Sequence, residues 1–229
     1  MTKKKGFLLS YLKYGDNDAI LHCFTADEGF ESFYIRGIYS SKNKKKFLLT
    51  PLSEIFLDVN LKRKSTALPL LNQIESVDTD YFEFDIKKSS VLFFISDLLN
   101  QVLKSENSQS KIYNEIELFI FHLKQDKKQI HLLFLFKIIQ FLGFAPLIND
   151  GKYLDIETGV FTENLSHQVF DEEISSIWKN ILENEDIYNF KIPQNKSREL
   201  LNSLLIYYQF HLENFRIPVS LEIVKEIFN

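Results

Sequence analysis

The spacing of hydrophobic residues changes once along this chain, near residue 86. Before that point, five short segments rich in β-branched, aromatic and aliphatic residues are separated by polar turns; they cover residues 6–14, 19–27, 31–39, 53–62 and 68–77. After it, apolar residues recur at helical spacing, as at Val91, Phe94, Ile95, Leu98 and Val102. The pattern predicts an α+β protein in which an all-β part precedes a helical part.

The five N-terminal segments fit a small closed barrel of antiparallel strands, for which the five-stranded OB-fold is the usual solution. Within "ESFYIRG", Phe33 and Ile35 alternate with Tyr34 and Arg36, so the last two should face away from the core. "DEG" reads as a hairpin turn in which Gly29 takes a positive φ. We therefore predict an OB-fold, nucleic-acid-binding domain over residues 1–80.

The remaining part, residues 81–229, is expected to form a mostly helical domain. Residues 129–144 are apolar nearly all round and end at a glycine, as expected of a buried central helix of a bundle. A short hairpin is expected near residues 149–165, around Thr158 and Gly159. No apolar run reaches the ~18 residues that a membrane span needs, and Cys23 is the single cysteine. A cytoplasmic protein, without an internal disulfide, is the natural interpretation.

Positive charge is concentrated in the predicted barrel. Residues 1–64 carry 12 Lys and Arg against 7 Asp and Glu, a net of +5, whereas the whole chain carries a formal net charge of −4. Such asymmetry suggests that one part meets a polyanion and the other does not. The candidate nucleic-acid-binding residues form a basic loop between two strands, a second basic cluster after a later strand and two flanking aromatic positions: Arg36, Lys42, Lys44, Lys45, Lys46, Lys62, Arg63, Lys64, Tyr34 and Tyr39.

These cations occupy a barrel loop of the kind that binds oligonucleotides in OB-folds, and aromatic faces can stack on bases without reading sequence. A charge run alone is more often a solvated loop. The lysines at Lys3, Lys4 and Lys5 and the net charge of the predicted domain favour a surface that follows phosphates.

Sequence signatures of catalysis are absent. The chain has no Walker loop, GxGxxG, GxSxG or HExxH motif, and its histidines lie far apart. "DND", from Asp16 to Asp18, lies between two strands and is more typical of a turn than of a metal site. We predict no enzymatic activity, no catalytic or metal-binding residue and no cofactor. The alternatives are an OB-fold RNA-binding protein, a metal-dependent nuclease, and a scaffold that contacts no nucleic acid.

The sequence resembles the RecO family of bacterial recombination mediators over nearly its whole length. The motifs that carry the resemblance are "GFLLSYLKYGDNDAILHCFTADEGFESFYIRGI", then a basic stretch and "LLTPLSEIFLDV", then "LFLFKIIQFLGFAP", and finally "SRELLNSLLIYYQFHLENFRIPVSLEIVKEIF". Arg36 matches an Arg-Gly pair of the family, and Lys42, Lys44, Lys45 and Lys46 match its basic loop.

The resemblance implies a DNA-repair mediator that binds single- and double-stranded DNA and anneals complementary strands. It also implies action with RecR, often RecF, and single-stranded-DNA-binding protein (SSB) to load RecA, in the cytoplasm at the nucleoid. An SSB C-terminal tail needs an apolar groove with a nearby cation, and Lys137, Arg198 and Arg216 are the candidate partner-binding residues. For Lys137 alone, the favoured interpretation is a lysine that extends its ammonium group to the domain edge.

One departure from the family concerns metal. Many RecO proteins carry four zinc-binding cysteines just after the Leu-Gly-aromatic-Ala-Pro stretch. This chain has no cysteine there, although the hairpin-like "YLDIETGVF" remains. We therefore expect the hairpin to fold without zinc.

Overall fold

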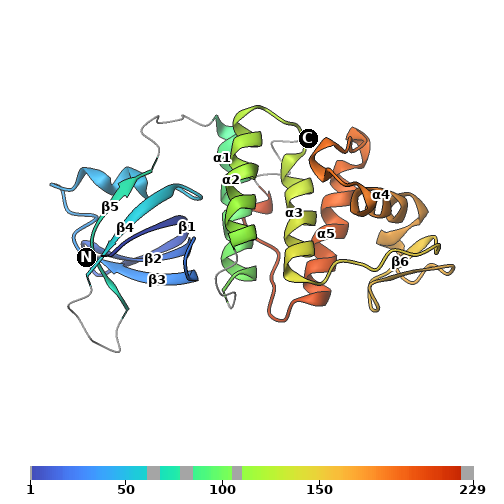
Figure 1. Cartoon of the computed structure of the whole chain (residues 1–229), viewed down its shortest axis with the longest axis horizontal. Coiled ribbons are helices and arrows are strands. Elements are labelled where there is room, and N and C mark those ends of the chain that lie inside the picture. Colours follow the sequence, from blue (N-terminus) through green and yellow to red (C-terminus); the bar gives the residue numbers. More distant parts are fainter. Residues whose placement is uncertain (1, 61–67, 78–84, 105–109, 223–229) are drawn as a thin grey trace. The chain divides into compact units, whose positions relative to one another are not determined.

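The computed structural model of the protein describes residues 2–60, 68–77, 85–104 and 110–222. Its larger elements are the strands β1 (Thr2–Tyr14), β2 (Asp18–Thr25), β3 (Gly29–Ile35), β4 (Glu54–Val59), β5 (Leu70–Ser76), β6 (Tyr153–Asp155) and β7 (Val160–Thr162), and the helices α1 (Ile86–Val102), α2 (Ser110–Lys124), α3 (Ile130–Leu142), α4 (Glu172–Glu183) and α5 (Ser197–His211). Strands fill the N-terminal part and helices dominate the rest (Figure 1). The predicted α+β organisation is confirmed.

The first five strands close into a barrel in the order β1-β2-β3-β5-β4. All neighbours are antiparallel except β3 and β5, which pair in parallel through Tyr34 with Leu70 and Ile35 with Leu71. Strand β1 is long enough to pair with β4 through its first half and with β2 through its second, and the register shifts between Leu8 and Ser10. A five-stranded closed barrel of this kind is OB-like, as the sequence predicts.

The barrel core follows the predicted alternation. Phe33 and Ile35 are buried, whereas Arg36 is exposed and Tyr34 is half-buried. Gly29 has φ 77°, so the turn between β2 and β3 uses the left-handed conformation that glycine tolerates. The second half of β1 differs, because Tyr11, Leu12 and the following two residues are all exposed beyond the register shift.

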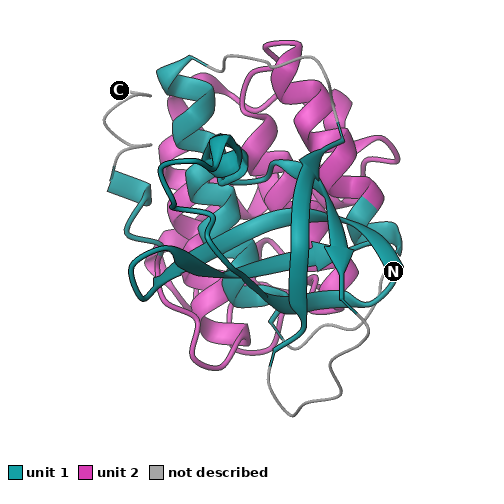
Figure 2. Ribbon diagram, turned by 90° about the vertical axis from the view of Figure 1, so that its left-hand side faces the viewer, with its two compact units in different colours: residues 1–113, 218–229 teal, residues 114–217 magenta. Residues whose placement is uncertain are grey.

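The described chain divides into two compact units, coloured separately in Figure 2. Unit 1 takes residues 1–113 and 218–229, and unit 2 takes residues 114–217. In unit 1, helix α1 packs on the barrel: the Ser96 hydroxyl donates to the Leu9 carbonyl at 2.5 Å, and Ser10 donates to Asn100 at 2.8 Å. A domain boundary near residue 80, where strands give way to helices, stays a prediction.

Unit 2 is built around a cluster of buried aromatic rings. Trp178 lies 4.6 Å from Phe136 and 4.9 Å from Tyr207, measured between ring centroids, and its indole N–H donates to Ser203 at 2.8 Å. Helix α3 is buried along most of its length and ends at Gly143, whose φ of 81° terminates the helix as predicted.

No helix within the described residues is both long and apolar enough to cross a membrane.

Candidate nucleic-acid interface

The basic segment, residues 36–46, is a folded connection between β3 and β4. Two successive turns form where Ser40 N–H donates to Gly37 O at 3.1 Å and Asn43 N–H donates to Ser40 O at 2.9 Å. The segment continues into the short 3₁₀-helix η1 (Lys44–Leu48), and the buried side chains of Ile38 and Leu48 pack in the barrel core. The apolar residues therefore anchor the segment, while most of its lysine side chains remain exposed.

A single carboxylate, Asp18 at the start of β2, holds the first turn of the basic segment. It accepts hydrogen bonds from the Tyr34 hydroxyl and, at 2.8 Å, from the Gly37 N–H. The two hydrogen bonds hold the pKa of Asp18 below its ordinary value, and the one from Tyr34 has the larger effect. The "DND" stretch therefore contributes a residue that positions the basic segment. The nearby Tyr39 N–H donates to Asn17 O at 2.9 Å, so the β1–β2 connection lies beside the basic segment.

Aromatic rings and cations alternate over this part of the barrel. The Tyr39 ring has the Lys46 ammonium 5.3 Å and the Lys13 ammonium 5.7 Å from its centroid. The centroid of the Tyr34 ring lies 6.0 Å from the Arg36 guanidinium and 5.8 Å from the centroid of the Tyr14 ring, which is perpendicular to it. Cation–π contacts of this kind hold positive groups close to flat apolar surfaces, which suits a ligand that carries both phosphates and bases.

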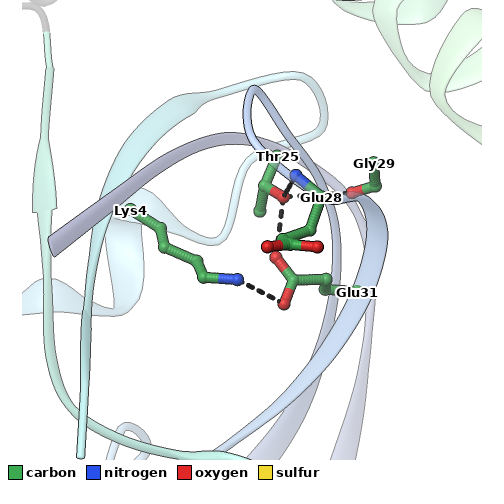
Figure 3. Close-up of polar contacts among 5 residues, drawn as sticks. All are labelled: Lys4, Thr25, Glu28, Gly29 and Glu31. Carbon is green, nitrogen blue, oxygen red and sulfur yellow. Dashed lines mark hydrogen bonds and ion pairs between the residues drawn. The ribbon is translucent and has the colours of Figure 1, made fainter. Parts of the chain in front are cut away.

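The N-terminal lysines are neutralised within the barrel. Lys3 pairs with Glu75 at 2.9 Å, Lys4 with Glu31 at 2.6 Å and Lys5 with Glu54 at 2.7 Å. Figure 3 shows Lys4 reaching one oxygen of the Glu31 carboxylate, whose other oxygen lies 2.7 Å from the Thr25 hydroxyl. The same hydroxyl accepts the Glu28 N–H at 3.3 Å. The lysines that open the chain therefore add little net charge to the surface.

The lysines of the basic segment differ in this respect. Among the described residues, no ion pair joins a carboxylate to Lys42, Lys44 or Lys46, and all three are exposed. Lys45 is half-buried and donates to the side-chain amide oxygen of Gln73 at 3.3 Å. Uncompensated charge thus gathers on the β3–β4 connection.

The connections that bind oligonucleotides in OB-folds are those between β1 and β2 and between β4 and β5. Here the basic segment belongs to the β3–β4 connection and lies beside the first of these. Lys62, Arg63 and Lys64, which fall in the β4–β5 connection, lie outside the described residues.

The three residues predicted to bind a partner peptide lie on different parts of unit 2. Lys137 is half-buried on α3, and its charge acts on the buried Glu115. Burial raises the pKa of Glu115, while a hydrogen bond from Tyr188 and the charge of Lys137 oppose that rise. Arg198 lies in the first turn of α5, and Arg216 follows the C-terminal end of that helix.

Sequence reasoning missed several residues that the structure places at the candidate interface. Lys13, Tyr14 and the half-exposed Phe47 lie on it, Asp18 positions it, and Gln73 contacts Lys45 from β5. Only Lys13 and Tyr14 had a signal in the sequence, because the polar and aromatic residues of "YLKY" break the alternation of apolar and polar residues that a buried strand would show. The positions of Asp18 and Gln73 depend on strand pairing.

The hairpin of β6 and β7 offers no zinc site. Within the described ranges, no group of three or more His, Cys, Asp or Glu side chains could hold a metal ion. Protein contacts fasten the hairpin instead: Lys179 donates to Gly151 O at 2.8 Å and lies 4.9 Å from the Phe161 ring, and the Leu154 N–H donates to Ser175 at 2.9 Å. The residues around the hairpin therefore do not fit the four-cysteine zinc site of many proteins in the family that the sequence resembles.

Comparisons with known proteins assign the chain to a class of recombination proteins. The family model "Recombination protein O N terminal" matches residues 1–79, and "Recombination protein O C terminal" matches residues 83–151. The chain belongs to the RecO family, whose members act in DNA repair and recombination.

Relatives described as DNA repair protein RecO match over essentially the full length of both chains. The protein of Flavobacterium psychrophilum is 27% identical over 236 residues, and that of Flavobacterium johnsoniae is 28% identical over 234 residues, each match covering 99% of both chains. That of Bacteroides fragilis is 26% identical over 242 residues, covering all of both chains.

Proposed function

We propose that this protein is a non-enzymatic recombination mediator that binds single- and double-stranded DNA through the basic segment and the aromatic residues around it. The observation that carries the proposal is the contrast among the barrel lysines: Lys3, Lys4 and Lys5 are paired with carboxylates, whereas Lys42, Lys44 and Lys46 have no ion-pair partner among the described residues. Membership of a DNA repair family supports the choice of DNA as the polyanion.

The mechanism is electrostatic. Lysines that approach phosphates release condensed counterions, and contacts to the backbone bind DNA without reading its sequence. Neutralising one strand also lowers its repulsion of a complementary strand, which favours annealing. In this function the protein acts at the nucleoid with RecR, SSB and often RecF, and helps to load RecA; these partners follow from the family resemblance.

The test is DNA binding by the purified protein at salt concentrations between about 50 and 200 mM. Replacing Lys44, Lys45 and Lys46 together by Ala should weaken binding to every sequence alike. It should also reduce the slope of log affinity against log salt by about 2 to 3 on duplex DNA, since each lost phosphate contact removes ~0.9. Strand annealing should slow in the same variant.

A charge-matched control is available in unit 2. Lys128, Lys152 and Lys191 are exposed, and their joint replacement by Ala changes the net charge equally without touching the barrel. The control should keep the wild-type slope. If the slope of log affinity against log salt were the same in the wild type and in the barrel variant, the basic segment would be excluded as the DNA site.

A further inference from the structure

A groove of about 450 Å³ lies in unit 1 between the basic segment and strand β5. Its cationic lining residues are Arg36, Lys42, Lys44 and Lys45. Ile38 and Ile74 also border the groove, but both are fully buried and expose no surface to it. No carboxylate is among the described residues that line it.

This lining selects for one chemical class of ligand. The four cations attract an anion, although Asp18 lies near Arg36 and Glu75 lies near Lys45. The aliphatic stems of the lysines give a flat, uncharged body an apolar surface to lie against. The amides of Asn43 and Gln73 add donors and acceptors at the walls. The volume falls in the range of about 300–1,000 Å³ typical of small-molecule sites, so one nucleotide is a suitable occupant in both size and chemistry.

The wall formed by the basic segment is held in place without a ligand. The Asn43 amide donates to Gly37 O at 3.1 Å and accepts the Lys45 N–H at 2.9 Å. Gly37 is in turn held by Asp18, as described above. The opposite wall is a strand, β5, paired with both β3 and β4. A site built in advance costs less conformational entropy when the ligand binds.

We infer that this groove receives one unstacked nucleotide of a single strand, with its phosphate against the cations, and that it makes the interface favour single-stranded over double-stranded DNA. The inference rests on the proposed function. A base in a duplex is paired and stacked, and it can enter a groove only after unpairing and unstacking. Duplex DNA therefore contacts the exposed lysines alone, whereas a single strand gains the groove in addition.

The decisive variant fills the groove without changing any charge. Asn72 is exposed on β5 and lines the groove, and its amide pairs with Asn60 and Asp58 rather than with a cation, so Asn72→Phe should occupy part of the volume while every cation stays in place. As a control, Thr2→Phe adds the same side chain at an exposed strand position of the barrel outside the groove. The probes are a thymidine oligonucleotide and a duplex of equal length, measured at one salt concentration.

We expect Asn72→Phe to weaken single-strand binding about tenfold and to leave duplex binding unchanged, while Thr2→Phe changes neither. As a second measurement, 4-thiothymidine in an oligonucleotide should cross-link wild-type protein within residues 36–45 or 72–74. Unchanged single-strand affinity in folded Asn72→Phe, or equal losses on both probes, would overturn the groove while leaving DNA binding intact. Cross-links elsewhere in the barrel would do the same. Absence of DNA binding by wild type would overturn the proposed function itself.

Discussion

A buried histidine on α3 gives the protein a specific sensitivity to acid. His131 is only 6% exposed in the most apolar helix of unit 2. Burial penalises its charged form and lowers its pKa to about 4 from an ordinary value of 6.5. We predict that protonation of this one side chain removes a large part of the stability of unit 2 in mild acid.

The sign and size follow from linkage. Because the folded-state pKa is the lower one, the unfolded chain binds a proton first as the pH falls. The stability tied to neutral His131 is therefore complete above pH 6.5, decreases as the pH falls below 6.5 and is lost by about pH 4. The difference between the two pKa values, at about 1.4 kcal/mol per pH unit, corresponds to ~3 kcal/mol of unfolding free energy.

The assay uses the single tryptophan of the chain. Trp178 is fully buried in unit 2, so its fluorescence reports the unfolding of that unit in urea. The free energy of unfolding is measured from pH 7.5 to about pH 4 for wild type and for His131→Gln, which keeps a polar side chain that does not titrate. Ile138→Val, at another buried position of α3, is a destabilised control that leaves His131 in place.

Other groups of unit 2 titrate as well, so the difference between proteins is the relevant quantity. Burial lowers the pKa of His122 and His211, which adds to the effect of His131, while burial raises the pKa of Glu115, which opposes it. These contributions are shared by all three proteins. His131→Gln should show a pH dependence shallower by ~3 kcal/mol, and Ile138→Val should keep the wild-type dependence. If the unfolding free energy of His131→Gln depended on pH as it does in the wild type, the reasoning would be refuted.

Three further predictions test the interface and the core. Asp18→Ala should weaken DNA binding, because the basic segment loses the carboxylate that holds it. Asp18→Asn should strengthen DNA binding, because the amide oxygen can keep the hydrogen bond to Gly37 without the negative charge. Equal gains in DNA affinity in both variants would show that Asp18 acts by charge alone. Ser203→Ala should lower the free energy of unfolding by about 1–3 kcal/mol, because the buried indole N–H of Trp178 loses its acceptor. Urea titration followed by circular dichroism measures this free energy, and an unchanged value would show that water replaces the hydroxyl. Lys137→Ala should weaken binding of an SSB tail peptide in a fluorescence titration and leave DNA affinity unchanged; equal peptide affinities would exclude Lys137 from that site.

The class of the fold could be predicted from local patterns. Five segments with strand character, followed by an abrupt change to helical spacing, define a barrel followed by helices. The spacing is informative because apolar residues recur with the period of the element whose one face is buried. Turn residues were equally readable: Gly29 and Gly143 both take the positive φ that their positions require. The basic segment was visible as composition alone.

The arrangement of charge on the barrel was decided by tertiary structure. Lys4 and Lys45 look alike in the sequence, yet strand pairing brings Lys4 to Glu31 and leaves Lys45 on the wall of a groove. Asp18 becomes the anchor of the basic segment because β2 begins beside the end of β3, a contact between residues far apart in sequence. The sequence by itself determined how much charge the barrel carries and which elements carry it. Only the closing of the barrel determined which charges are neutralised, since that depends on which side chains meet across strands.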